Sequence, residues 1–253
     1  MKDKIILITG ASSGIGEACA RIFAKYGAKL LLCARRYERL EFLATELKQK
    51  YNTVAHTFQL DVRNHESVLK KFSNLPEEWR SIDLLVNNAG LAAGRAKFQD
   101  AAFEDWEAMI DTNIKGLLYV TRAVLPNMLK HNSGHIINIG SIAGHEAYPS
   151  GNVYCATKFA VSALTRGLKM DIVDTNIRVS TIDPGMTETE FSEVRYKGDK
   201  EMAKKVYAGL TPLVAEDVAD AVFYCASRPA HVNIFEIIMM PTAQASVAVV
   251  HKK

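Results

Sequence analysis

The sequence predicts one α/β domain built on a doubly wound sheet of seven mostly parallel strands, with helices on both faces. Short apolar runs alternate with longer helical patterns from one end of the chain to the other, which is typical of consecutive βαβ units. The apolar runs are nearly continuous, as expected for parallel strands that helices cover on both faces. A length of 253 residues suits a single core, and no repeat or Pro/Gly-rich linker divides it.

Composition excludes several classes of protein. The 31 Lys and Arg residues and 28 Asp and Glu residues give a net charge of +3 without a basic block, so nucleic acid is not an expected partner. No apolar run reaches the length of a signal-peptide core or a membrane span, which predicts a cytoplasmic protein that does not bind membranes. The cysteines show no metal-ligand spacing, and we expect buried free thiols and no metal site at Cys19, Cys33, Cys155 and Cys225.

The elements alternate in chain order, and one segment departs from the alternation. Met186–Leu213 is polar and charged, and we expect a substrate lid with one short helix there. Strands are expected at Lys4–Thr9, Lys29–Ala34, Val54–Leu60, Ile82–Asn87, His135–Ile139, Ile177–Ile182 and Ile234–Met240. Helices are expected at Gly14–Tyr26, Tyr37–Lys50, Glu66–Ser73, Phe103–Lys130, Asn152–Val173 and Glu216–Ala226.

A glycine-rich loop joins the first expected strand to the first helix. Its spacing is G-x-x-x-G-x-G, and glycines allow the tight turn and close backbone approach that a pyrophosphate needs. The N–H groups and dipole at the start of the helix attract negative charge. The alternative is a purely structural turn, but the position between strand and helix favours dinucleotide binding by Gly10, Ser12, Ser13, Gly14, Ile15 and Gly16.

Two arginines end the second expected strand. An NAD site usually carries an acid about 20 residues beyond the glycines, whereas this chain has Arg35 and Arg36 there. A guanidinium suits a 2′-phosphate, so NADP(H) is the expected cofactor; the alternative is that both arginines only solvate the next helix. We expect one of Asn87 and Asn88 only to brace the sheet. The residues after the third and fourth strands that should lie beside the adenine and ribose are Asp61, Val62, Asn88, Ala89 and Gly90.

A possible proton-transfer group follows the fifth strand. Tyr154 and Lys158 are four residues apart and share one helix face, so the ammonium can lower the pKa of the phenol. Ser141, at the strand end, can bind the same substrate oxygen. Taken alone, Tyr-x-x-x-Lys on an exposed helix face is a common coincidence.

Together with Asn113 and Pro184-Gly185, these motifs resemble the short-chain dehydrogenase/reductase family over essentially the whole chain. The resemblance implies a Rossmann-type fold and an enzyme in which Tyr154 is the general acid/base and Ser141 orients the carbonyl. It implies that Lys158 lowers the tyrosine pKa and holds the nicotinamide ribose, and that Asn113 anchors a water linked to Lys158. The residues implied to contact the nicotinamide and pyrophosphate are Pro184, Gly185, Thr187 and Thr189.

A narrower resemblance lies in the C-terminal third. Phe191–Gly198, Pro229–Ile234 and Met239–Thr242 resemble the NADP-dependent serine and 3-hydroxy acid dehydrogenases, which oxidise L-serine, L-allo-threonine and related acids or reduce the matching semialdehydes. The resemblance also implies a homotetramer built by pairing two long helices. The alternatives are a broad carbonyl or 3-oxoacyl reductase and, from another class, a non-catalytic dinucleotide-binding regulator. The complete proton-transfer group argues against the regulator.

The expected substrate class predicts a cation in the lid. A 3-hydroxy acid carries a carboxylate close to the reacting alcohol, and burying that charge without a partner is costly. The lid offers Arg195, Lys197 and Lys200, of which Arg195 has the planar fork that fits a carboxylate. The alternative is a solvated surface arginine.

Overall fold

The computed structural model describes all 253 residues and contains the expected seven-stranded sheet, in which every pair of neighbouring strands is parallel. The strand order is β3-β2-β1-β4-β5-β6-β9, so the chain changes direction across the sheet between β1 and β4. Ligands of such sheets lie at the carboxyl ends of the strands near this switch point. The strands are β1 (Ile5–Thr9), β2 (Lys29–Ala34), β3 (Ala55–Gln59), β4 (Leu84–Asn87), β5 (Gly134–Ile139), β6 (Ile177–Pro184) and β9 (Glu236–Met239).

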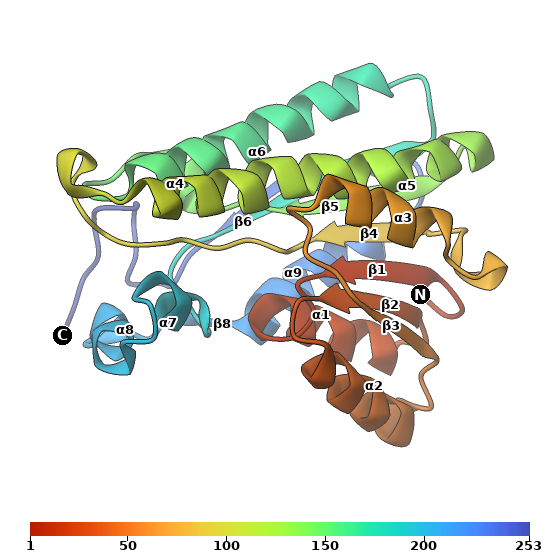
Figure 1. The fold of residues 1–253 in the computed structure, drawn as a ribbon, viewed down its shortest axis with the longest axis horizontal. Coiled ribbons are helices and arrows are strands. Elements are labelled where there is room, and N and C mark those ends of the chain that lie inside the picture. The colour runs from red at the N-terminus through yellow and green to blue at the C-terminus, as the bar shows by residue number, and fades with distance from the viewer.

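Helices cover both faces of the sheet and bury a separate apolar core on each (Figure 1). None of these helices combines the length and apolar character needed to cross a bilayer. One layer contains α1 (Gly14–Lys25), α2 (Tyr37–Tyr51) and α9 (Ala215–Ala226). The other contains α3 (His65–Ser73), α4 (Phe103–Ile110), α5 (Leu117–His131) and α6 (Asn152–Asp171).

The expected helical stretch over Phe103–Lys130 is present, but its middle is not α-helical. A π-helical segment, η3 (Asp111–Gly116), separates α4 from α5. Gly116 of this segment packs against Val62, where a Cβ would come within 2.6 Å of a valine methyl. The wider turn changes which side chains face the sheet and buries Asn113, although the apolar periodicity on either side continues.

The lid segment contains two short helices and not the single one that was expected. They are α7 (Phe191–Arg195) and α8 (Lys200–Tyr207), and the ends of the segment are joined by the parallel pair β7 (Thr187–Glu188) and β8 (Leu213–Val214). Figure 1 shows α7 and α8 beyond the carboxyl ends of the sheet strands, on the side where the strand arrows point. The segment therefore lies where the topology places a ligand.

Candidate active site

A cavity of about 460 Å³ opens at the carboxyl edge of the sheet and collects nearly all of the residues predicted from the sequence. Its volume falls within the range of small-molecule sites. Two predicted residues, Gly16 and Asn113, do not line it. Those that do are Gly10, Ser12, Ser13, Gly14, Ile15, Arg35, Arg36, Asp61, Val62, Asn88, Ala89, Gly90, Ser141, Tyr154, Lys158, Pro184, Gly185, Thr187, Thr189 and Arg195.

The glycine loop leads directly into the first turn of α1. Gly10 and Gly14 have φ values of +65° and +55°, a backbone conformation that favours glycine. Ser13 begins the helix without a side-chain capping bond, so the first N–H groups of α1 have no side-chain partner. Gly16 has a packing role, because a Cβ there would come within 2.5 Å of both Gly10 O and Asn88 Nδ2. The loop thus fits the pyrophosphate of a dinucleotide.

The second arginine after β2 lies across the glycine loop. Arg36 donates to Ser12 Oγ at 3.3 Å and to Ser13 Oγ at 2.6 Å, and pairs with Glu190 of the lid at 2.7 Å. Glu190 also pairs with Arg39 at 2.6 Å; burial alone would raise the pKa of its carboxyl, but the two guanidinium groups lower it. Arg35 lines the same end of the cavity. This cationic group fits the 2′-phosphate of NADP.

The two asparagines at the end of β4 both brace the structure, but only one reaches the cavity. Asn87 is buried and donates to Thr121 and Asn138. Asn88 lines the cavity, and its amide donates to Thr9 O and to Gly10 O. Asn88 therefore holds the glycine loop in place beside the cofactor position.

The proton-transfer group is buried on α6. The Lys158 ammonium donates to Ile139 O at 2.9 Å and lies 5.9 Å from the centre of the Tyr154 ring. Ser141 accepts from Ala143 N at 3.1 Å, and its hydroxyl faces Pro184 O at 3.4 Å. The three side chains come from one face of α6 and the end of β5, as the spacing predicted.

The expected lowering of the tyrosine pKa does not appear in this structure. Burial raises the pKa of Tyr154 and outweighs the lowering by the Ser141 hydroxyl and the Arg195 guanidinium. Burial also lowers the pKa of Lys158 to about 8, and the negative charge of Asp183 works in the opposite direction. A buried ammonium is costly, so Lys158 loses its proton at a lower pH than a surface lysine does.

Asn113 lies in the π-helical segment with its whole side chain engaged. The amide oxygen accepts from Leu91 N at 2.9 Å, while the amide nitrogen donates to Leu91 O and to Thr157 Oγ1. These bonds tie the loop after β4 to helix α6. The water beside Lys158 stays a prediction for Asn113.

Arg195 reaches the cavity from the end of α7. Its guanidinium lies 5.8 Å from the Tyr154 ring centre and donates to Tyr148 Oη at 2.8 Å. Lys197 instead pairs with Asp105, and neither Lys197 nor Lys200 lines the cavity. The lid therefore presents one strong hydrogen-bond fork beside the proton-transfer group.

The sequence reasoning missed several residues that line the cavity. Tyr148 precedes α6 in a loop, and Glu190 is a single carboxylate in the lid. Gln244 follows the last strand and accepts from Met186 N at 2.8 Å, which joins the C-terminal segment to the start of the lid. No local motif marks any of the three, because the fold alone brings them to this edge.

A parallel sheet with this glycine loop and a buried Ser/Tyr/Lys group at its carboxyl edge defines a dinucleotide-dependent oxidoreductase of the Rossmann type. The model of the family described as short chain dehydrogenase matches residues 4–200, and the chain belongs to that family. It is 50% identical over 242 residues to the NADP-dependent 3-hydroxy acid dehydrogenase YdfG of Salmonella typhi, covering 95% of this chain and 96% of the relative.

Two further relatives are also similar over nearly the whole chain. Sulfoacetaldehyde reductase 2 of Chromohalobacter salexigens is 49% identical, with 95% of each chain covered. A solved closed form of serine dehydrogenase complexed with NADP+ is 48% identical, with a TM-score of 0.92 and coverage of 98% of this chain and 100% of that one. The similarity therefore includes the lid and the C-terminal segment that line the cavity.

Proposed function

We propose that the protein is an NADP-dependent oxidoreductase of small 3-hydroxy acids, such as L-serine, L-allo-threonine or 3-hydroxypropionate, or of the matching semialdehydes. The observation that carries this proposal is the Arg195 guanidinium placed 5.8 Å from the Tyr154 ring inside the cavity. In this proposal the substrate alcohol lies at the Tyr154 hydroxyl and its carboxylate at Arg195. Named relatives that act on serine and on 3-hydroxy acids support the substrate class.

In this proposal the residues of the site divide the work of holding the cofactor and of moving the proton. NADP supplies the hydride acceptor or donor when it is bound, with Arg35 and Arg36 on the 2′-phosphate and the glycine loop on the pyrophosphate. Tyr154 exchanges the proton of the substrate oxygen, and Ser141 donates a hydrogen bond to that oxygen. Lys158 stabilises the phenolate and binds the ribose beside it, while the segment Met186–Leu213 acts as a lid that excludes water.

A substrate panel tests the role of Arg195. Arg195→Ala should raise KM for L-serine and 3-hydroxypropionate about ten- to a hundredfold, since a charge-assisted bond contributes roughly 1.5–3 kcal/mol. The KM for an uncharged alcohol should change little. Lys197→Ala is the matched control, because that lysine lies on the same lid and pairs with Asp105 outside the cavity. Equal losses for charged and uncharged substrates in Arg195→Ala would contradict the carboxylate role.

The choice of cofactor is tested separately. The unmodified enzyme should use NADP with much higher kcat/KM than NAD, and Arg35→Asp should erode or reverse this preference. Each variant is measured with both cofactors, so NAD serves as the control within one protein. Equal efficiency with the two cofactors before any substitution would contradict the arginine assignment.

A sulfonate substrate is the second candidate. The relative named sulfoacetaldehyde reductase 2 acts, by its name, on an aldehyde that carries an anionic sulfonate. Arg195 would serve either anion, so a panel that includes sulfoacetaldehyde decides between them. If uncharged carbonyls are the best substrates instead, a broad carbonyl reductase replaces both candidates.

We also propose that the protein assembles as a homotetramer through α5 and α6. These helices keep large apolar side chains exposed at Leu118, Leu129, Phe159 and Met170. Size-exclusion chromatography with light scattering should give about four chains per particle, and Phe159→Glu should lower that number. A cytoplasmic location stays a prediction, which cell fractionation can test.

A further inference from the structure

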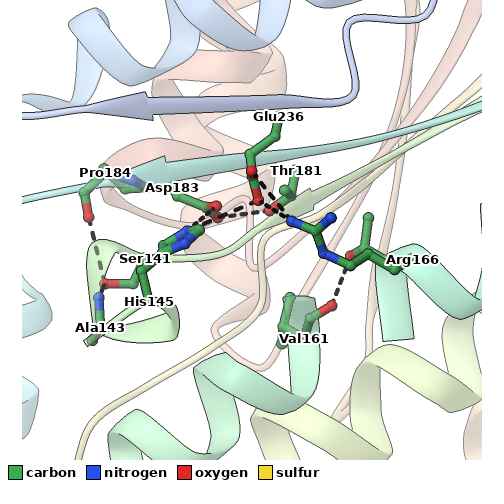
Figure 2. A network of polar contacts seen from close by, with 10 residues as sticks. Ser141, Ala143, His145, Val161, Arg166, Thr181, Asp183, Pro184 and Glu236 are labelled. Carbon is green, nitrogen blue, oxygen red and sulfur yellow. Dashed lines mark hydrogen bonds and ion pairs between the residues drawn. The ribbon is translucent and has the colours of Figure 1, made fainter. Parts of the chain in front are cut away.

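A polar cluster outside the cofactor cavity joins four elements behind the catalytic serine (Figure 2). Asp183, near the end of β6, is 2% exposed. His145 Nε2 donates to the Asp183 carboxylate at Oδ2, 2.8 Å away, and Thr181 Oγ1 donates to Asp183 Oδ1 at 2.7 Å. Glu236 of β9 lies 3.9 Å from His145, and Arg166 of α6 approaches Glu236 at 3.4 Å.

The Asp183 carboxylate lies against the backbone of the loop that follows β5. A Cβ on Gly140 would overlap Asp183 Oδ1, so the side chain occupies the space that any other residue would need there. Gly140 N donates to Ile182 O at 2.8 Å, which fixes this point to β6. His145 reaches Asp183 from the other end of the loop, past the short helix η4 (Ile142–Gly144).

The end of β5 and this loop contact or carry two members of the proton-transfer group. Ile139 O accepts from the Lys158 ammonium, and Ser141 follows two residues later. Asp183 also directly precedes Pro184, whose carbonyl faces the Ser141 hydroxyl. The buried Asp183 carboxylate thus contacts the backbone at Gly140, between Ile139 and Ser141. His145 contacts the same carboxylate from the far end of the loop.

We propose that Asp183 and His145 form a positioning pair that holds the backbone from Ile139 to Ser141 in place. Neither residue lines the cavity, so both act through Lys158 and Ser141 without touching substrate. This proposal rests on the proposed oxidoreductase function. It extends that function by assigning a role to a pair that no motif in the sequence marks.

The charges around the pair support an electrostatic role. Burial lowers the pKa of Lys158 to about 8, and the charge of Asp183 opposes that lowering. His145 after η4 and Glu236 from β9 lie within 4.8 Å of Asp183, and the charge of Asp183 acts on Lys158 of α6. Tyr154 lies on the lysine's own helix, and Arg195 acts on Tyr154 from α7. Both Asp183 oxygens have hydrogen-bond partners, which fix the orientation of the carboxylate, and Glu236 pairs with Arg166.

Asp183→Asn tests the charge, because it removes the negative charge with little change in shape. We expect kcat to fall at least tenfold, with the Kd for NADP changed less than twofold. Without the carboxylate the Lys158 pKa falls further, so the alkaline limb of the kcat profile should move to lower pH by about one unit. Asp174→Asn, an exposed Asp beyond the end of α6, is the matched control and should leave both readouts unchanged.

His145 variants test the positioning. His145→Gln keeps a donor for Asp183 and should retain most of the turnover, whereas His145→Ala should lose about tenfold in kcat. Equal kcat for these two variants, or a folded Asp183→Asn with normal kcat and an unmoved limb, overturns the proposal. If Asp183→Asn does not fold, the two His145 variants decide alone. Failure of the proposed function is distinguishable, because the unmodified protein would then show no turnover with NADP(H).

Discussion

At the scale of single residues, the proposed proton transfer depends on the Tyr154 hydroxyl. Tyr154→Phe keeps the ring and its edge contact with Phe191, whose centre is 5.7 Å away. Turnover should fall about 10²–10⁴-fold, the usual contribution of general acid–base catalysis, while NADP binding measured by fluorescence stays close to normal. Tyr224→Phe, an exposed Tyr on α9, should have no effect. Near-normal turnover in the Tyr154→Phe variant would show that another group moves the proton.

Glu190 gives a second prediction at this scale. Its carboxylate pairs with Arg36, which lies on the glycine loop, so it competes with a 2′-phosphate for that guanidinium. Glu190→Gln should tighten NADP binding a few fold and leave NAD binding unchanged, since an exposed ion pair contributes only about 0.2–1 kcal/mol. Isothermal titration with both cofactors measures this. Glu188→Gln, exposed on β7, is the control, and weaker NADP binding in Glu190→Gln would contradict the competition.

Residue spacing correctly predicted that Tyr154 and Lys158 lie together, because helix geometry converts a four-residue step into a shared face; their catalytic roles stay a prediction. Tyr154 and Lys158 lie on one face of α6 for that reason. The tyrosine pKa could not be predicted in this way, because its direction depends on burial by distant elements. Arg195 was found only because the expected substrate required a cation. Neither a motif nor the expected substrate required a residue such as Glu190 or Gln244, so these two were not predicted.

At the scale of elements, Arg178 of β6 holds the C-terminal end of α9. Its guanidinium donates to four backbone carbonyls, those of Cys225, Ala226, Arg228 and Val232. The last carbonyls of a helix lack intrahelical partners, so losing this arginine leaves several of them unsatisfied. Arg178→Met should lower the free energy of unfolding by about 2–4 kcal/mol, measured by urea denaturation.

Arg122→Met is the control for this substitution, since Arg122 is exposed on α5. A loss below about 0.5 kcal/mol in Arg178→Met, the level of an ordinary surface change, would contradict the capping role. The apolar runs predicted all seven strands: β1, β2, β4, β5 and β6 are almost wholly buried, whereas the edge strands β3 and β9 are only partly buried. They could not predict the π-helical segment, because one extra residue in a turn leaves the surrounding periodicity intact.

At the scale of the whole molecule, His135 makes folding sensitive to acid. Burial, together with the charge of Arg178, lowers its pKa to about 3. The unfolded chain, with a His pKa of about 6.5, binds more protons below that value, so stability is lost as pH falls from about 6.5 towards 3. The slope is at most about 1.4 kcal/mol per pH unit for one group.

His135→Leu should flatten the dependence of unfolding free energy on pH between about 6.5 and 5, above the range where most carboxyl groups titrate. Ser180 Oγ still donates to Ile234 O in that variant. Denaturation at several pH values measures the slope, and His131→Leu, exposed at the end of α5, should keep the normal slope. An unchanged slope in His135→Leu would assign the acid sensitivity to other groups.

The four free cysteines lie in three different apolar clusters, so the reactivity of each thiol reports local opening of the cluster around it. Cys19 and Cys225 belong to one core, Cys33 to the second and Cys155 to the small cluster around Tyr154. Burial raises the pKa of every one of these thiols, so a thiol reagent reacts only when the surrounding layer opens. The labelling rate of each cysteine, followed by mass spectrometry, therefore measures the opening of one layer. NADP should slow labelling at Cys155 first.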